Sequence, residues 1–155
     1  MADAPVIARH RAGMFRDMGQ LPPELYVELV DLTVAYLSHA IPSGEYVGWL
    51  ASPHGSPEVV AGAGVQLRRI LPRPIASGGQ TRIAFAREAI VLNVFTDAAW
   101  RGHGAARQLM EHVLEWAAAT RIDRLVLHAS EEGRPLYERL GFVLTNEMRY
   151  ARALG

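Results

Sequence analysis

Residues 88–119 constrain the fold of this chain more than any other stretch, because they join an apolar run to an amphipathic segment through a glycine-rich turn. Residues 88–96 are almost continuously apolar, which is typical of a strand covered on both faces. Residues 105–119 repeat apolar side chains at helical spacing and carry polar side chains on the opposite face. The sequence therefore predicts a strand, a turn and a helix at this point of the chain.

The turn has the chemistry of an anion-binding site. It consists of Arg101, Gly102, His103, Gly104, Ala105 and Ala106. Glycines allow a ligand to approach the backbone, and the first amides of a helix have no partner inside that helix. Because this end of a helix also carries a partial positive charge, phosphate is its usual ligand.

Two common phosphate motifs do not fit this turn. A P-loop requires lysine after its last glycine, and the chain contains no lysine. A dinucleotide fingerprint requires a third glycine at the position of Arg107. Because Arg107 occupies the position of the third glycine, the fingerprint is incomplete, which argues against a nucleotide-dependent oxidoreductase.

A third motif does fit. Residues 101–106 match the pattern Gln/Arg-x-x-Gly-x-Gly/Ala of the GCN5-related N-acetyltransferases (GNAT) at Arg101, Gly104 and Ala106. Residues 136–142, Leu-Tyr-Glu-Arg-Leu-Gly-Phe, are similar to the second recurring segment of that family, Leu-Tyr-x-x-x-Gly-Phe. With both segments in order, the resemblance covers nearly the whole chain.

The resemblance implies an enzyme that moves an acetyl group from acetyl-CoA directly to a primary amine of a small molecule or protein. In the family, the amides of the turn hold the pyrophosphate, and the pantetheine arm bonds the end of the preceding strand, with the acetyl carbonyl near the amide of Leu92 or Asn93. Ser130 replaces an asparagine that often contacts the arm. The implied cofactor-binding residues are Leu92, Val94, Phe95, Thr96, Arg101, Gly102, His103, Gly104, Ala105, Ala106 and Ser130.

Two residues are implied in catalysis. Tyr137 matches the family's general acid, its alternative being a helix tyrosine packed on the sheet. Glu88 lies at the offset of the glutamate that activates the amine in histone-acetylating members, but about 13 Å of strand separate it from Leu92. An ion pair of Glu88 with Arg87 or Arg82 is an equal alternative. Asp97 and His128 are reserve candidates for the base.

The periodicity and the turn signals predict an α/β (α+β) fold in the order β-α-α-β-β-β-α-β-α-β. The GNAT resemblance implies a mixed, mostly antiparallel central sheet flanked by helices on both faces. A short strand is expected from Val6, followed by a helix that contains Met14, Phe15 and Met18. The other expected elements are a helix over 22–40, strands over 45–51, 58–70 and 88–96, a helix over 105–119, a strand over 123–130, a helix over 133–140 and a strand over 142–152.

Three details of these elements bear on the site. Gly62 and Gly64 indicate a bulge or a close backbone approach in the strand over 58–70. Residues 71–87 show no periodicity, so a lid over the acceptor site and plain disorder are equal expectations. Phe15 and Met18 are either pocket or core residues, and helical spacing favours the core.

Composition limits the class of protein. A length of 155 residues predicts a single domain over 1–155. The 16 basic and 16 acidic side chains cancel, which disfavours nucleic-acid and membrane partners. Because cysteine is absent, disulfides, thiolate metal sites and an acyl-cysteine intermediate are excluded, and no metal is expected.

The remaining expectations are a cytoplasmic location, since no signal peptide or membrane span is recognisable, and a possible homodimer, implied by the resemblance alone. The alternative function is a non-catalytic acyl-CoA-binding sensor. The acceptor has no recognisable motif.

Overall fold

The computed structural model describes residues 3–148. The helices are α1 (Ala4–Asp17), α2 (Tyr26–Ala40), α3 (Ala105–Ala119) and α4 (Arg134–Arg139), with short 3-10 turns η1 (Pro23–Leu25) and η2 (Ala98–Trp100). The strands are β1 (Tyr46–Ala51), β2 (Ala61–Arg68), β3 (Arg73–Ser77), β4 (Gln80–Ala84), β5 (Glu88–Thr96) and β6 (Arg124–Leu127). Within these residues, no helix is both long and apolar enough to cross a bilayer.

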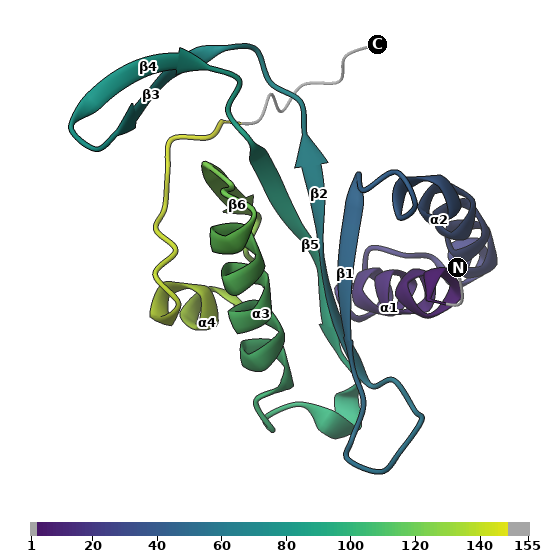
Figure 1. Cartoon of the computed structure of the whole chain (residues 1–155). Helices are drawn as coiled ribbons and strands as arrows, with labels where there is room; N and C mark the ends of the chain where they lie inside the picture. Colours follow the sequence, from purple (N-terminus) through teal and green to yellow (C-terminus); the bar gives the residue numbers. More distant parts are fainter. Residues whose placement is uncertain (1–2, 149–155) are drawn as a thin grey trace.

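The central sheet is mixed and has the strand order β1-β2-β5-β6. The pairs β1/β2 and β2/β5 are antiparallel, whereas β5 and β6 are parallel. Helices α1 and α2 lie on one side of the sheet and α3 lies on the other, beside α4 (Figure 1). The expected α+β class, with a mostly antiparallel sheet between helices, is confirmed.

The larger core lies between the sheet and α3. The apolar stripe of α3 supplies Leu109, Met110 and Val113, which are all buried against β2 and β5. Trp49 of β1 and Trp116 of α3 meet edge to face, with ring centroids 5.7 Å apart. The predicted strand over 88–96 and helix over 105–119 therefore pack together as their patterns indicated.

A smaller core lies on the opposite face, between the sheet and the first two helices. There α1 supplies Ala4 and Ile7, α2 supplies Leu37 and Ala40, and β1 supplies Tyr46, and all five are buried. This packing holds α1 against β5. The side chains of α1 that point along the sheet are therefore available to a site at the end of β5.

The middle of β5 contains a β-bulge. The register with β2 shifts between Gly62 and Gly64, so that Asn93 and Val94 together lie opposite Ala63. Asn93 adopts a left-handed backbone conformation with φ of 57°. Its side chain is buried and donates a hydrogen bond of 3.1 Å to the hydroxyl of Tyr46. The glycine pair in β2 indicated an irregularity here, but the extra residue belongs to the partner strand.

The expected strand from Val6 is wrong, because α1 already begins at Ala4. Pro5 lies in the first turn of this helix, where its fixed φ favours helix formation. Ala4, Ile7 and Ala8 are buried at helical spacing. The two small alanine side chains allow α1 to lie close to the sheet.

Residues 71–87 are not a disordered loop. Strands β3 and β4 form an antiparallel hairpin that projects beyond the central sheet (Figure 1). Gly78 and Gly79 join them, with φ of 60° and 78°. Two glycines at positive φ are a signature of a tight hairpin turn, so this dipeptide indicates a hairpin and not an irregular loop.

The last expected strand is not formed where the structure describes it. Residues 142–148 have no strand, and 149–152 lie outside the described residues. Among the described residues, no strand of the central sheet pairs with this segment. Because a strand is stabilised by pairing with a neighbour, an apolar run alone does not produce one.

Candidate active site

A cleft of about 1070 Å³ opens where β5 and β6 diverge. Its walls come from α1, the carboxyl half of β5, the start of α3, the segment after β6, and α4. The lining residues that matter below are Arg11, Met14, Phe15, Asp17, Met18, Leu92, Asn93, Val94, Phe95, Thr96, Arg101, Ala106, His128, Ser130, Tyr137 and Glu147.

The floor of the cleft is an unpaired strand edge. Pairing between β5 and β6 ends at Val91 and Leu127, although β5 continues to Thr96. In the described part of the chain, the backbone of residues 92–96 therefore has no strand on its β6 side. Such an edge offers hydrogen-bonding groups to an extended ligand, as it would to another strand.

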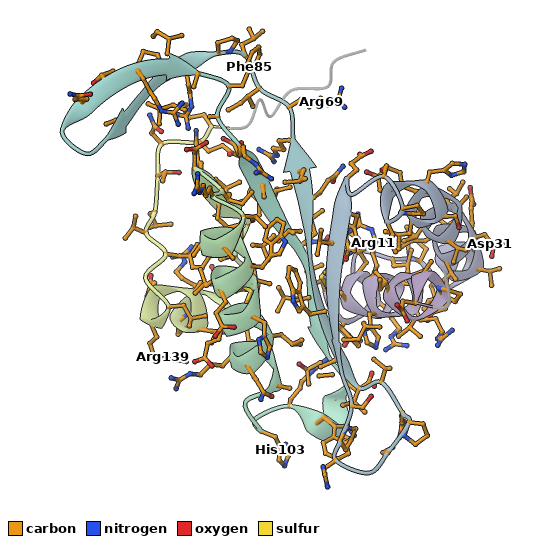
Figure 2. The ribbon with its side chains drawn as sticks, in the orientation of Figure 1. Arg11, Asp31, Arg69, Phe85, His103 and Arg139 are labelled. Carbon is orange, nitrogen blue, oxygen red and sulfur yellow. The ribbon has the colours of Figure 1, made fainter. Side chains whose placement is uncertain are left out.

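The glycine-rich turn lies at one end of this edge. Gly102 and Gly104 have φ of 79° and 85°, a conformation that glycine adopts without a steric penalty. Within residues 3–148, no side chain caps the first turn of α3, so its leading amides remain open to a ligand. His103 lies on the turn itself (Figure 2), with its Nδ1 atom 2.9 Å from the carbonyl oxygen of Arg101.

Arg101 holds the turn in place. Its Nε atom donates a 3.0 Å hydrogen bond to the carbonyl oxygen of Thr96, and its guanidinium forms an ion pair with Asp17 of α1. Three elements, α1, β5 and the turn before α3, are therefore joined by one side chain. Its guanidinium is already neutralised by a carboxylate.

Tyr137 lies on the opposite wall, on α4. Burial raises the pKa of its hydroxyl, which therefore stays protonated at neutral pH. Its ring meets Phe142 edge to face at 6.0 Å. A Cβ on Gly133 would lie 3.1 Å from the ring, so this glycine allows the tyrosine to pack closely. The Oγ atom of Ser130 accepts a hydrogen bond from the amide of Gly133, and its own proton remains to be donated.

Comparison with known proteins adds to this geometry. Residues 79–154 match a family described as "Acetyltransferase (GNAT) domain". A GCN5-related N-acetyltransferase from Ralstonia eutropha JMP134 is 29% identical, covers 97% of this chain and 93% of its own, and superposes with a TM-score of 0.79. The chain belongs to the GNAT family. No curated protein matches the sequence significantly.

Two further GNAT-like structures share the fold. A predicted acetyltransferase from Clostridium acetobutylicum, crystallised with acetyl-CoA, is 23% identical over 97% of this chain and 90% of its own, with a TM-score of 0.74. Glucosamine-6-phosphate N-acetyltransferase from Arabidopsis thaliana is 15% identical over 96% of this chain and 94% of its own, with a TM-score of 0.64. At these identities the likeness concerns the fold.

The GNAT cleft also contains a histidine paired with a carboxylate. The Nε2 atom of His128 lies 2.7 Å from an oxygen of Glu147, and both side chains are exposed to the cleft and solvent. The hydrogen bond from His128 lowers the pKa of Glu147, which favours the charged carboxylate. His128 was a reserve candidate in the sequence. Glu147 had no signal, because its partner lies on a distant segment.

Glu88 occupies a different place. It is buried at the start of β5, with Arg68 of β2 at 3.3 Å and Arg124 of β6 at 3.5 Å. It is not among the described residues that line the cleft. An ion pair was one of its two expected roles, although its partners are not Arg87 or Arg82. Asp97 lines a second, smaller cavity beside α1.

Helix α1 contributes more residues to the cleft than the sequence pattern indicated. Phe15 and Met18 were favoured as core residues, yet both line the cleft, and Met18 is exposed. Arg11 lies beside them and had no signal of its own. Helical spacing identifies one face of α1, but it does not distinguish contact with the sheet from contact with a cavity at the end of the sheet.

Proposed function

We propose that this GNAT protein transfers an acetyl group from acetyl-CoA directly to a primary amine of a small molecule or a protein. The observation that carries the proposal is the continuity of the cleft. It runs from the open amides of α3, along the unpaired edge of β5, to Tyr137. A long acyl-CoA molecule needs these three features in this order.

The coenzyme would be held mostly by backbone groups. The diphosphate fits the amides of the turn and the first turn of α3, between Arg101 and Ala106. The pantetheine arm fits the edge of β5 at Val94, Phe95 and Thr96, and Ser130 also lines this cleft. A Clostridium protein with the same fold was crystallised with acetyl-CoA, which supports acetyl-CoA as the ligand.

The transfer requires one bond to form and one to break. The neutral amine attacks the thioester carbonyl, a carbon–nitrogen bond forms, and the carbon–sulfur bond breaks. An amide at the bulge, that of Leu92 or Asn93, would stabilise the oxyanion. Tyr137 would return a proton to the thiolate, a role supported by its place in the wall of the cleft.

The amine must also lose a proton. His128 in its pair with Glu147 is the base that we favour, because both residues line the cleft that contains Tyr137. The position of Glu88 offers less support, since Arg68 and Arg124 occupy its carboxylate. Glu88 would require a relay through water to reach the amine.

Two measurements test the function. Calorimetry with acetyl-CoA should give saturable binding, and an assay of CoA release with a panel of amines should give turnover. Binding without turnover on any amine would favour the acyl-CoA sensor instead. If acetyl-CoA gives no saturable binding, both the acetyltransferase proposal and the sensor alternative are contradicted.

The pH dependence of kcat/KM tests the base. His128→Gln should abolish the acidic limb of the profile. His112→Gln is a matched control, because His112 forms a similar pair with Glu115 on the surface of α3. An acidic limb that survives in His128→Gln and disappears in Glu88→Gln would assign the base to Glu88.

A further inference from the structure

Among the described cations that line the cleft, Arg11 is the one for which no carboxylate partner is found. Of the charged side chains that line the cleft, Arg101 pairs with Asp17 and His128 pairs with Glu147. In the described part of the chain, no carboxylate forms an ion pair with the half-buried Arg11. Burial lowers the pKa of Arg11, which reflects the cost of holding this charge away from water.

The position of the guanidinium is fixed by its neighbours. Its Nη1 atom donates a 2.7 Å hydrogen bond to Oδ1 of Asn93, and its central carbon lies 4.9 Å from the centroid of the Phe15 ring. Arg11 extends from α1, on the side of the sheet opposite α3 (Figure 2). A guanidinium has five N–H donors, and within the described residues one hydrogen bond to a side chain is formed.

The neighbours of Arg11 also define where a ligand would lie. Asn93 is the bulge residue, adjacent to Leu92, and the proposed thioester carbonyl lies at these amides. A ligand group on Arg11 would therefore lie next to the reacting amine. Met14, Phe15 and Met18 of α1 provide an apolar wall on the same side of the cleft.

From these contacts we propose that the acceptor is an amine that carries a carboxylate close to its nitrogen and an apolar side chain, as an apolar α-amino acid does. This inference rests on the proposed function. Arg11 binds the carboxylate through the planar fork that matches two carboxylate oxygens. The apolar side chain contacts the α1 wall, and the amino group faces the thioester.

Pairs of acceptors that differ only in the carboxylate test the inference. L-phenylalanine is compared with phenethylamine, and L-leucine with 3-methylbutylamine, by CoA release from acetyl-CoA. The wild-type protein should show a kcat/KM at least about 10-fold higher for the amino acid, as one charge-assisted hydrogen-bonded pair provides. Equal values for both members of each pair would overturn the inference and leave the proposed function intact.

Variants assign the preference to Arg11. Arg11→Gln should remove it by raising KM for the amino acid alone, and Arg11→Lys, which keeps the charge without the fork, should retain part of it. Arg9→Gln is the control, because Arg9 lies on the same helix and lines the other cavity. An equal loss of kcat with both acceptors in Arg11→Gln would mean that Arg11 stabilises the oxyanion, and would overturn the carboxylate role.

The two levels of failure are distinguishable. Without turnover of any amine, the proposed function itself fails. If decarboxylated amines are acetylated as well as amino acids, only the inference fails. Should Arg11→Gln not fold, the wild-type comparison and Arg11→Lys still decide the outcome.

Discussion

The hydroxyl of Tyr46 lies directly against the Cα of Gly64, in the space that a Cβ on residue 64 would need. The same hydroxyl accepts a hydrogen bond from the side chain of Asn93, so Tyr46 contacts both strands at the bulge. A glycine at position 64 is therefore a packing requirement of the bulge.

Gly64→Ala should destabilise the fold by about 1–3 kcal/mol, because the added methyl group overpacks a buried contact. Urea denaturation measures this loss. The atoms that the methyl group would meet are the hydroxyl, Cζ and Cε2 of Tyr46, so Tyr46→Ala, which removes the ring, should recover part of it in the double variant. Strictly additive losses would show that Tyr46 is not the cause.

Gly104→Ala should weaken acetyl-CoA binding. Position 104 has φ of 85°, and an alanine there either strains the turn by about 1 kcal/mol or shifts the amides of α3. Gly79→Ala is a matched control, since Gly79 has φ of 78° and open space around it on the distant hairpin. Calorimetry should show weaker binding in Gly104→Ala alone; an equal change in both variants would remove the turn from the coenzyme site.

Tyr137→Phe should lower kcat by about 100-fold, the usual contribution of a general acid, with little change in the Kd of acetyl-CoA. The pKa of Tyr137 is raised, so its hydroxyl loses its proton only above the ordinary range of tyrosine. In the wild type, kcat should therefore fall at alkaline pH as this proton is lost, and Tyr137→Phe should lack that limb. An unchanged kcat would exclude Tyr137 from the mechanism.

Glu88→Gln should reduce stability without altering the pH dependence of catalysis. The buried carboxylate bridges arginines from β2 and β6, and the neutral amide loses both ion pairs. Because the two arginines are partly exposed, we expect a loss of about 1–3 kcal/mol. Chemical denaturation measures it, and kcat/KM across pH provides the second readout.

The sequence predicted the elements whose signals are local. The apolar run of β5 and the stripe of α3 lie within single segments, and their bounds agree with the structure. The hairpin β3–β4 also had a local signal, in Gly78 and Gly79, but the aperiodic residues around it concealed the signal. Val6 belongs to a helix whose Ala4, Ile7 and Ala8 are buried, and this packing is not visible in a short window.

The site was less predictable, because its contacts join distant segments. The pair of His128 with Glu147 and the contact of Arg11 with Asn93 each depend on how α1 and the segment after α4 lie against β5. Motif matching predicted the turn and Tyr137 as site residues, because both lie in segments that resemble those of the family. It contains no information about Arg11, because Arg11 lies outside both motifs.

The surplus residue at Asn93 reverses the alternation of side chains along β5. Ala89 and Val91 contact the α3 core, and beyond the bulge Val94 contacts it, whereas Phe95 lies against His10 and Gly13 of α1. Odd-numbered side chains therefore point to α3 before the bulge and even-numbered ones after it. Deleting Asn93 would straighten the strand and leave Val94 facing α3 and Phe95 facing α1, but it would remove the side chain that contacts Tyr46 and Arg11. The extra residue is therefore required by the contacts of Asn93 at the cleft and not by the two layers that β5 separates.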